Sequence, residues 1–398
     1  MTRGVPDSCP GVLRLHEAAD GPLARIRVPG GLLEPAQWQA LAEAAHAVGD
    51  GNIELTSRGN VQLRRVRDAD ALTDRLTTVG LLPSRTHERV RNIIASPLSG
   101  RIGGSTDIHP LVAALDTGLR GAPRLAELPG RMLFTLDDGR GDVSGLGADI
   151  GIHALGADEF AVLLAGGDSG IRLPATDAVE VMLAAAHGFL ELRGDDAGHW
   201  RLHDIENGAE RLIALLGLPA TADRLELAAT QPTPIGWLAQ DNGLVSLGAG
   251  ARLGSVTART AEFLAAIERP IFATPWRSLV ITDLTEWAAE QVVRVLAPMG
   301  MIFDADSPWL LVSACAGLPG CAKSHADVRA DAAEAVDAGR VLPVETAPDT
   351  GASEVLPPTA SDIAVGGRQH WSGCDRRCGR PRGVVTDIVA TSTGYRIG

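Results

Sequence analysis

The sequence predicts an α+β protein in which one half-domain is repeated later in the chain. The first copy begins near Gly11 and the second near residue 244, and each alternates short apolar strands with helices. A glycine-containing turn precedes the first helix of each copy, at residues 29–32 and 251–254. The competing explanation for this weak duplication is chance similarity between alanine-rich helices.

The elements of the two copies follow in the same order. In the first copy we expect strands at residues 23–28, 53–55 and 61–63, and helices at 35–46 and 69–79. In the second copy we expect strands at 244–247 and 279–281, and helices at 257–267 and 285–296. Thr56 and Arg58 of the first copy have a looser echo in Thr274 and Arg277.

The remaining segments predict further α+β structure. Between the copies we expect strands at 134–136 and 160–164, a helix at 179–190 and a polar surface connection at 191–208. After them we expect a strand at 310–313, a helix at 324–338 and a surface loop at 341–358.

Composition limits the classes of partner. The chain has 398 residues and a net charge of −13, which argues against a nucleic-acid partner. No run approaches the roughly 18 apolar residues of a membrane span, and the N-terminus lacks the apolar stretch of a signal peptide. We therefore expect a cytoplasmic protein without a membrane partner, in which clustered cysteines bind metal or do redox chemistry.

Four of the five cysteines form two close pairs. Cys315 and Cys321 are spaced C-x5-C, and Cys374 and Cys378 are spaced C-x3-C. Four thiolates suit either a [4Fe-4S] cluster or a structural zinc ion, and unligated thiols are a third possibility. The C-x5-C spacing is wider than zinc pairs usually have, so the cluster is favoured. Cys9 stands apart, and we expect it to be a spare thiol near a mobile end.

These residues resemble the nitrite and sulfite reductase superfamily. The likeness continues in the stretch LTSRGNVQLR at residues 55–64, which is similar to the tetrapyrrole-binding strand of that family, and at Arg91–Asn92. The resemblance covers nearly the whole chain. It implies that Cys315, Cys321, Cys374 and Cys378 bind a [4Fe-4S] cluster, with Cys378 nearest the tetrapyrrole.

The fold implied by this resemblance consists of duplicated ferredoxin-like half-domains plus two larger α+β units of the nitrite/sulfite-reductase type. The half-domains are expected at residues 10–80 and 226–300. The larger units are expected at residues 81–225 and 301–398, and the second of them carries the cysteines.

Within the superfamily, the chain looks most like the precorrin-3B synthase branch. The likeness lies in ASPLSGR (95–101), DDGRGDVSGLGAD (137–149), CAGLPGCAKSHADVRADA (315–332) and HWSGCDRRCGRP (370–381). It implies O2-dependent hydroxylation of the tetrapyrrole precorrin-3A, with lactone formation, in aerobic cobalamin biosynthesis. It also implies a mononuclear non-haem iron beside the cluster. NADH would be the ultimate electron source, either through a separate electron-donor protein or by direct use.

One departure separates this chain from the reductases. Sulfite and nitrite reductases carry Lys-x-Lys after a Leu-Pro, where the lysines bind and protonate a small anion. Here Arg131 and Leu133 occupy those two positions. Reduction of sulfite needs several proton donors, so the loss of one favours the synthase.

The resemblance assigns roles to particular side chains. Catalytic roles fall to Arg58, Arg91 and Arg131, and binding of the tetrapyrrole to Arg58, Asn60, Gln62, Arg64 and Arg91. Arginine forks suit the carboxylates of such a ligand, and Arg101 and Arg277 are further candidates. For any one arginine, the alternative is a solvated surface side chain. His325 and His370 could ligate the second iron, although a structural hydrogen-bonding role is favoured for both.

Two other functions stay open. In a sirohaem-dependent sulfite or nitrite reductase, the tetrapyrrole would be a resident cofactor and not the substrate. In a zinc-stabilised binding protein, the four cysteines would form a structural clip.

Overall fold

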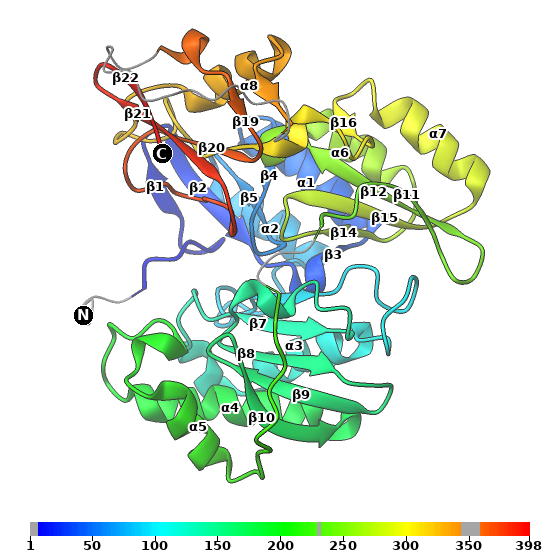
Figure 1. Ribbon diagram of the computed structural model, residues 1–398, viewed down its shortest axis with the longest axis vertical. Coiled ribbons are helices and arrows are strands. Elements are labelled where there is room, and N and C mark those ends of the chain that lie inside the picture. The colour runs from blue at the N-terminus through cyan, green and yellow to red at the C-terminus, as the bar shows by residue number, and fades with distance from the viewer. Residues whose placement is uncertain (1–6, 229–231, 344–358) are drawn as a thin grey trace.

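The structure, a computed structural model, describes residues 7–228, 232–343 and 359–398 and has the predicted α+β class (Figure 1). The two repeated halves pack on one shared core, and a separate unit formed by residues 93–216 lies below them in Figure 1. Residues 344–358 of the expected surface loop lie outside the described part. In the described residues, every helix is too short or too polar to cross a membrane.

The first half-domain is a five-stranded antiparallel sheet with two helices packed on it. Its helices, α1 (Pro35–Val48) and α2 (Ala69–Thr78), agree closely with the predicted ranges. Pro35 begins α1 without the loss of a hydrogen bond, because an N–H at that position has no partner within the helix. The Asp68 side chain caps α2 by accepting from the backbone N–H of Ala71. In spatial order the strands are β1 (His16–Ala18), β2 (Gly21–Ile26), β5 (Val61–Leu63), β4 (Asn52–Leu55) and β13 (Ser255–Thr257).

The second half-domain repeats this arrangement. Its helices are α6 (Ala258–Ala265) and α7 (Glu286–Leu296), each capped at its N-terminus by a threonine side chain. Its strands are β11 (Gly236–Ala239), β12 (Val245–Ala251), β15 (Ser278–Leu284), β14 (Ile271–Ala273) and β3 (Leu32–Leu33), in that order, with β16 (Met301–Ile302) beside β12.

The two half-domains exchange a short strand. β3 from the first half pairs with β14 of the second, and β13 from the second half pairs with β4 of the first. Each exchanged strand follows a 3-10 turn, η1 (Pro29–Gly31) or η6 (Arg252–Gly254). The close approach of η1 to β14 requires glycine at residue 31, because a Cβ on Gly31 would lie 2.1 Å from the carbonyl oxygen of Ala273. The structure therefore contains the predicted duplication, and the exchange joins the two copies.

The middle unit is a mixed five-stranded sheet with three helices. Its first three strands run parallel and the last three antiparallel. The strands are β6 (Ile93–Ala95), β7 (Phe134–Asp137), β8 (Ile150–Ala154), β9 (Glu159–Leu164) and β10 (Gly167–Pro174). The helices are α3 (His109–Gly121), α4 (Ala178–Arg193) and α5 (Gly208–Leu216). The expected polar connection at 191–208 is only partly correct, because Leu202 inside it is fully buried in the core of this unit.

The C-terminal unit places both cysteine pairs at one end of a sheet. Cys315 directly follows β17 (Val312–Ala314), and Cys374 comes two residues after β20 (Gln369–Ser372). These strands are parallel neighbours, with Ala314 opposite Trp371, so the loops that follow them emerge side by side. The rest of the unit is β21 (Thr386–Thr391), β22 (Gly394–Ile397), the pair β18 (Val341–Leu342) and β19 (Val365–Gly366), and α8 (Val328–Asp337).

Two expected boundaries in this unit are wrong. The strand expected at 310–313 begins only at Val312, because Pro308 opens a 3-10 turn, η7 (Pro308–Leu311). The helix expected from Ser324 begins at Val328, capped by Asp327. Residues 324–327 instead contact the second cysteine loop, since the backbone N–H of His325 donates to the carbonyl of Gly373 at 2.9 Å.

Candidate functional site: an arginine cavity beside four cysteines

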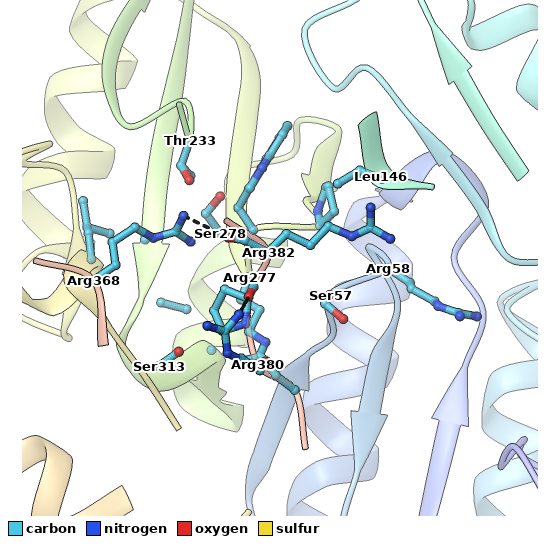
Figure 2. A pocket seen from close by; sticks show the side chains of 18 of the residues that line it. Ser57, Arg58, Leu146, Thr233, Arg277, Ser278, Ser313, Arg368, Arg380 and Arg382 are labelled. Atoms are coloured by element: carbon cyan, nitrogen blue, oxygen red, sulfur yellow. Dashed lines mark hydrogen bonds between the residues drawn. The ribbon is translucent and has the colours of Figure 1, made fainter. Parts of the chain in front are cut away.

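A cavity of about 500 Å³ opens between the half-domains, the middle unit and the C-terminal unit (Figure 2). That volume lies within the roughly 300–1,000 Å³ of small-molecule sites. The two half-domains contribute hairpin turns, and the middle unit contributes the loop that follows β7. We call it the arginine cavity after the six arginines that line it: Arg58, Arg201, Arg277, Arg368, Arg380 and Arg382.

Equivalent turns of the two half-domains deliver Arg58 and Arg277. In the β4–β5 turn, the Thr56 hydroxyl accepts from the backbone N–H of Arg58 and of Asn60. In the β14–β15 turn, the Thr274 hydroxyl accepts from Trp276 and Ser278 in the same way. The sequence similarity between these two segments therefore reflects a repeated turn, which places one arginine from each half-domain at the same cavity.

The six arginines fall into two groups. Arg201 and Arg380 are neutralised by ion pairs, with Asp149 at 2.6 Å and Asp387 at 2.9 Å. The other four form no ion pair with a carboxylate of the described residues, and their hydrogen bonds go to backbone carbonyls. Those bonds are Arg58 to Arg131, Arg277 to Gly379, Arg382 to Gly145 and Arg368 to Arg382.

Burial raises the free energy of these four charged guanidinium groups as long as no anionic ligand is bound. It lowers the pKa of Arg58 to about 10, and the charge of Arg201 lowers it further. Burial likewise lowers the pKa of Arg277, and the charge of Arg329 lowers it further. Arg368 and Arg382, which are more exposed, shift in the same direction. At neutral pH Arg58 is still protonated, so the cavity offers positive charge for which an anion is the natural partner.

The two cysteine loops contact each other directly. The backbone N–H of Gly373 donates to the Sγ of Cys315 at 3.2 Å, an interaction that stabilises a ligating thiolate. Only glycine fits at that point, because a Cβ on Gly373 would lie 1.9 Å from the Oγ of Ser324. Close packing of the loops thus brings residues more than fifty positions apart to one place.

The four thiols lie within electrostatic range of one another. Burial raises the pKa of Cys378, and the nearby Cys315, Cys374 and Cys321 raise it further, whereas Arg376 opposes the shift. Mutual repulsion of four thiolates is relieved by a bound metal centre. Four sulfur donors and a backbone N–H aimed at one of them could hold a [4Fe-4S] cluster. Among the described residues, no three of these sulfurs lie within 4.8 Å of one another, which is wider than the four sulfurs of a single zinc ion require.

Two arginines brace these loops from the half-domains. Arg64 pairs with Asp20 at 2.6 Å and also donates to the carbonyl of Gly320, next to Cys321. Arg277 donates to the carbonyl of Gly379, next to Cys378. Each cysteine pair is therefore tied to the sheet that carries the arginine.

Of the residues predicted to bind or act on a tetrapyrrole, Arg58 and Arg277 line the cavity and six others do not. Arg91 is buried against Asp116, which neutralises it. Arg131 is half exposed, 4.9 Å from the Trp200 ring, with Asp7 at 3.6 Å. It contributes only its backbone carbonyl, which accepts from Arg58. These two predicted catalytic side chains therefore lie outside the arginine cavity.

Three of the other four predicted residues hold the half-domain together. Asn60 is fully buried and joins the backbone N–H of Val28 to the Asn92 side chain. Gln62 accepts from Arg25 and donates to Glu54, so its side chain is committed within the sheet. Arg64 braces the first cysteine loop as described. Arg101 lies elsewhere, in an ion pair with Asp283 at 2.8 Å.

The two candidate histidines make structural contacts. His370 is fully buried, its Nδ1 lies 2.9 Å from the Ser313 hydroxyl, and burial lowers its pKa to about 4. The backbone of His325 joins the two cysteine loops. The one group of three close potential metal ligands among the described residues, Asp137, Asp138 and Asp142, includes neither histidine and none of the four paired cysteines.

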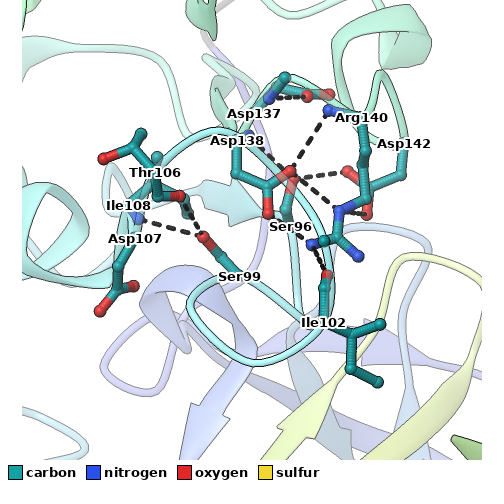
Figure 3. A network of polar contacts seen from close by, with 12 residues as sticks. Ser96, Ser99, Ile102, Thr106, Asp107, Ile108, Asp137, Asp138, Arg140 and Asp142 are labelled. Carbon is teal, nitrogen blue, oxygen red and sulfur yellow. Dashed lines mark hydrogen bonds and ion pairs between the residues drawn. The ribbon is translucent and has the colours of Figure 1, made fainter. Parts of the chain in front are cut away.

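A carboxylate cluster borders the cavity at the loop after β7 (Figure 3). Asp137 accepts from four backbone N–H groups of residues 139–144, and Asp138 pairs with Arg140 at 2.6 Å. Asp142 accepts from the Ser96 hydroxyl at 2.5 Å. Because protein groups already satisfy Asp137 and Asp138, the cluster is poorly suited to hold a metal ion.

Sequence reasoning missed five charged residues of the cavity: Asp142, Arg201, Arg368, Arg380 and Arg382. The density of arginines around the second cysteine pair was the available signal for the last three. The partners that distinguish free from neutralised arginines are distant in sequence, so no local pattern identifies them.

The expectation for Cys9 is only partly correct, because its thiol is free but its position is firmly held. Its side chain is buried, and its Sγ accepts from the Nη2 of Arg27 at 3.2 Å. The backbone carbonyl of Cys9 also accepts from Arg89. The first described residues are therefore anchored on the half-domain and the middle unit.

Comparison with known proteins agrees with this architecture. Residues 16–73, which run from β1 into α2, match the nitrite/sulfite reductase ferredoxin-like half domain. The structure is similar to that of the Mycobacterium tuberculosis NirA protein, with a TM-score of 0.72 and 20% identity, over 94% of this chain and 74% of that one. The likeness confirms the predicted fold class.

Two curated relatives differ in how much of the chain they match. A precorrin-3B synthase of Sinorhizobium sp is 26% identical over 99% of this chain and 82% of its own length. A ferredoxin–nitrite reductase of Synechococcus elongatus is 33% identical, but over only 30% of this chain and 25% of its own. The predicted resemblance to the superfamily and to its precorrin-3B synthase branch is confirmed.

Proposed function

The chain is a homologue of a precorrin-3B synthase along nearly its whole length, and from this premise we propose that it is an oxidoreductase that converts precorrin-3A to precorrin-3B. The reaction hydroxylates the meso carbon between rings A and D and closes a lactone with the ring A acetate. One atom of O2 enters the substrate and the other leaves as water. The two electrons this requires come ultimately from NADH, through a separate donor protein.

The observation that carries the proposal is the set of four arginines without carboxylate partners. A carboxylate-rich tetrapyrrole supplies the missing counter-ions, and guanidinium forks bind carboxylates in bidentate geometry. Arg58 and Arg277 would hold the substrate from the two half-domains. Arg368 and Arg382 would hold it from the C-terminal unit. Leu133 and Leu146 give the cavity an apolar wall for the macrocycle.

The four cysteines would hold a [4Fe-4S] cluster, which supplies single-electron transfer when bound. Arg64 and Arg277 keep the cysteine loops fixed against the half-domain sheets. Fixed loops maintain the distance between the sulfur ligands and the cavity, as efficient electron transfer requires. The proposal includes a mononuclear non-haem iron but assigns it no ligands.

A sirohaem-dependent sulfite or nitrite reductase is the second candidate, since the same arginines could hold sirohaem as a resident cofactor. The local identity to a nitrite reductase favours it. Leu133 argues against it. This buried leucine lines the cavity at the position of the second lysine in the Lys-x-Lys motif of the reductases. A small anion there would lack that proton donor.

Anaerobic purification tests the proposal directly. We expect iron and acid-labile sulfide in near-equal amounts, a broad cluster absorption without a Soret band, and O2-dependent turnover of precorrin-3A with an electron donor. Intense sirohaem bands and sulfite or nitrite reduction would establish the reductase instead. Zinc without sulfide would establish a structural clip and overturn both redox functions.

A further inference from the structure

Asp142 is the one carboxylic acid among the described residues that line the arginine cavity. It occupies the loop after β7, and its side chain is 12% exposed. The arginines of the cavity form no ion pair with it, although free guanidinium groups line the same space. A carboxylate in a cavity for a polyanionic ligand would repel that ligand, so its presence requires an explanation.

The surroundings of Asp142 disfavour its ionisation. The nearest cation, Arg140, lies 3.8 Å away at its Nε, and its two closer contacts go to Asp138. The buried carboxylates of Asp137 and Asp138 stand beside it (Figure 3). His153 faces Asp137 and not Asp142, with Nδ1 3.4 Å from its Oδ1. Crowded carboxylates in a site of limited exposure cannot all be charged.

The three carboxylates are not equivalent. Asp137 is stabilised as an anion by four backbone N–H groups, and Asp138 by the fork of Arg140. Asp142 has one neutral donor, the Ser96 hydroxyl, which itself accepts from the backbone N–H of Asp138. The proton of the group therefore belongs on Asp142, whose Oδ1 accepts from Ser96 and whose Oδ2 lies 3.8 Å from the Nε of Arg140.

The electrostatic balance agrees with this assignment. Burial raises the pKa of Asp142 to about 7 and the charge of Asp137 adds to the rise, while Ser96 and Arg140 oppose it. Both the protonated and the ionised form are therefore accessible near neutral pH, so a ligand can select the protonated form.

We propose that Asp142 binds the tetrapyrrole as a neutral carboxylic acid, donating a hydrogen bond from its protonated carboxyl group while the arginines hold the ligand's carboxylates. Binding then takes up a proton wherever Asp142 is ionised in the free protein. This inference rests on the proposed function for the identity of the ligand. Its consequence is a pH-dependent affinity that belongs to the protein, since the carboxylates of the ligand are ionised throughout the range concerned.

The test is a fluorescence titration with uroporphyrin III, a stable carboxylate-rich tetrapyrrole, between pH 6 and pH 8. Wild-type Kd should rise about tenfold over this range, because one proton is lost per site with a pKa near 7. Asp142→Asn keeps the shape, stays neutral and keeps a donor, so its Kd should be flat and close to the wild-type value at pH 6. Glu290→Gln, on the exposed face of α7, should retain the wild-type profile.

A second variant tests the positioning by Ser96. Ser96→Ala removes the donor that favours the charged form, so the rise in Kd should move to higher pH. A wild-type Kd that is independent of pH, or an equal rise in Asp142→Asn, would overturn the inference. Turnover of precorrin-3A is measured separately on the wild type. Its absence would refute the proposed function and leave the pH-linked binding to be judged from uroporphyrin alone.

Discussion

Arg277 donates from its Nη2 to the backbone carbonyl of Gly379 at 3.1 Å, directly after Cys378. The same arginine lines the cavity, so one side chain touches both the proposed substrate site and a cysteine loop. A Cβ on Gly379 would lie 2.6 Å from that Nη2. A ligand carboxylate held by Arg277 would therefore lie close to the redox centre that the cysteines are proposed to hold.

Arg58 and Arg131 were both predicted to be catalytic, and the structure separates them. Arg58→Gln should raise the Kd for uroporphyrin III about ten- to a hundredfold, the value of a charge-assisted hydrogen bond of roughly 1.5–3 kcal/mol. Arg131→Gln, whose side chain lies outside the cavity, should change it less than twofold. Equal losses in the two variants would contradict the boundary of the cavity.

The cysteine assignment predicts the metal content of single variants. Cys321→Ser should lose bound iron, acid-labile sulfide and turnover together, because three thiolates and a hydroxyl hold a cluster poorly. Cys9→Ser is the matched control and should retain full iron and sulfide, since Cys9 contacts arginines and not the other thiols. Retained cluster absorbance in Cys321→Ser would refute that ligand.

Arg91 is expected to stabilise the fold without taking part in binding. Arg91→Met leaves the Asp116 carboxylate with Arg120 as its one remaining arginine partner among the described residues, and should lower the free energy of unfolding by roughly 2–4 kcal/mol in urea. Arg120→Met removes the more exposed partner and should cost under about 1 kcal/mol. In both folded variants the Kd for uroporphyrin III should match the wild type.

The ion pair between Arg101 and Asp283 joins the middle unit to the second half-domain and should be sensitive to acid. Burial opposes ionisation of Asp283, but the hydrogen bond and charge of Arg101 outweigh it, so its pKa lies below the usual range. A lowered folded pKa contributes stability above the unfolded pKa of about 3.9, and this is lost as pH falls through the folded value. Arg101→Met should therefore lower the melting temperature at pH 7 and have little effect near pH 2. A constant difference across that range would argue against the ion pair as its source.

The local elements could be predicted well from the sequence. The ranges of α1, β5 and α7 depend on hydrophobic period, on Pro35 and on the threonine cap, and such signals act within a few residues. The duplication could also be predicted from the sequence, because Thr56 and Thr274 organise their turns by local hydrogen bonds. The spacing of the four cysteines likewise indicated a shared metal centre before any contact was known.

The composition of the cavity was decided by tertiary structure. Whether an arginine is free or neutralised depends on one distant carboxylate: Arg91 has Asp116, Arg380 has Asp387, and Arg58 has none among the described residues. The strength of an electrostatic interaction depends on distance and burial, which exist only after folding. For the same reason no local pattern in the sequence distinguished Asp142 from the other aspartates. By itself the sequence determined the elements, the duplication and the cysteine spacing, and the packing of four units around one cavity determined which charges remain available to a ligand.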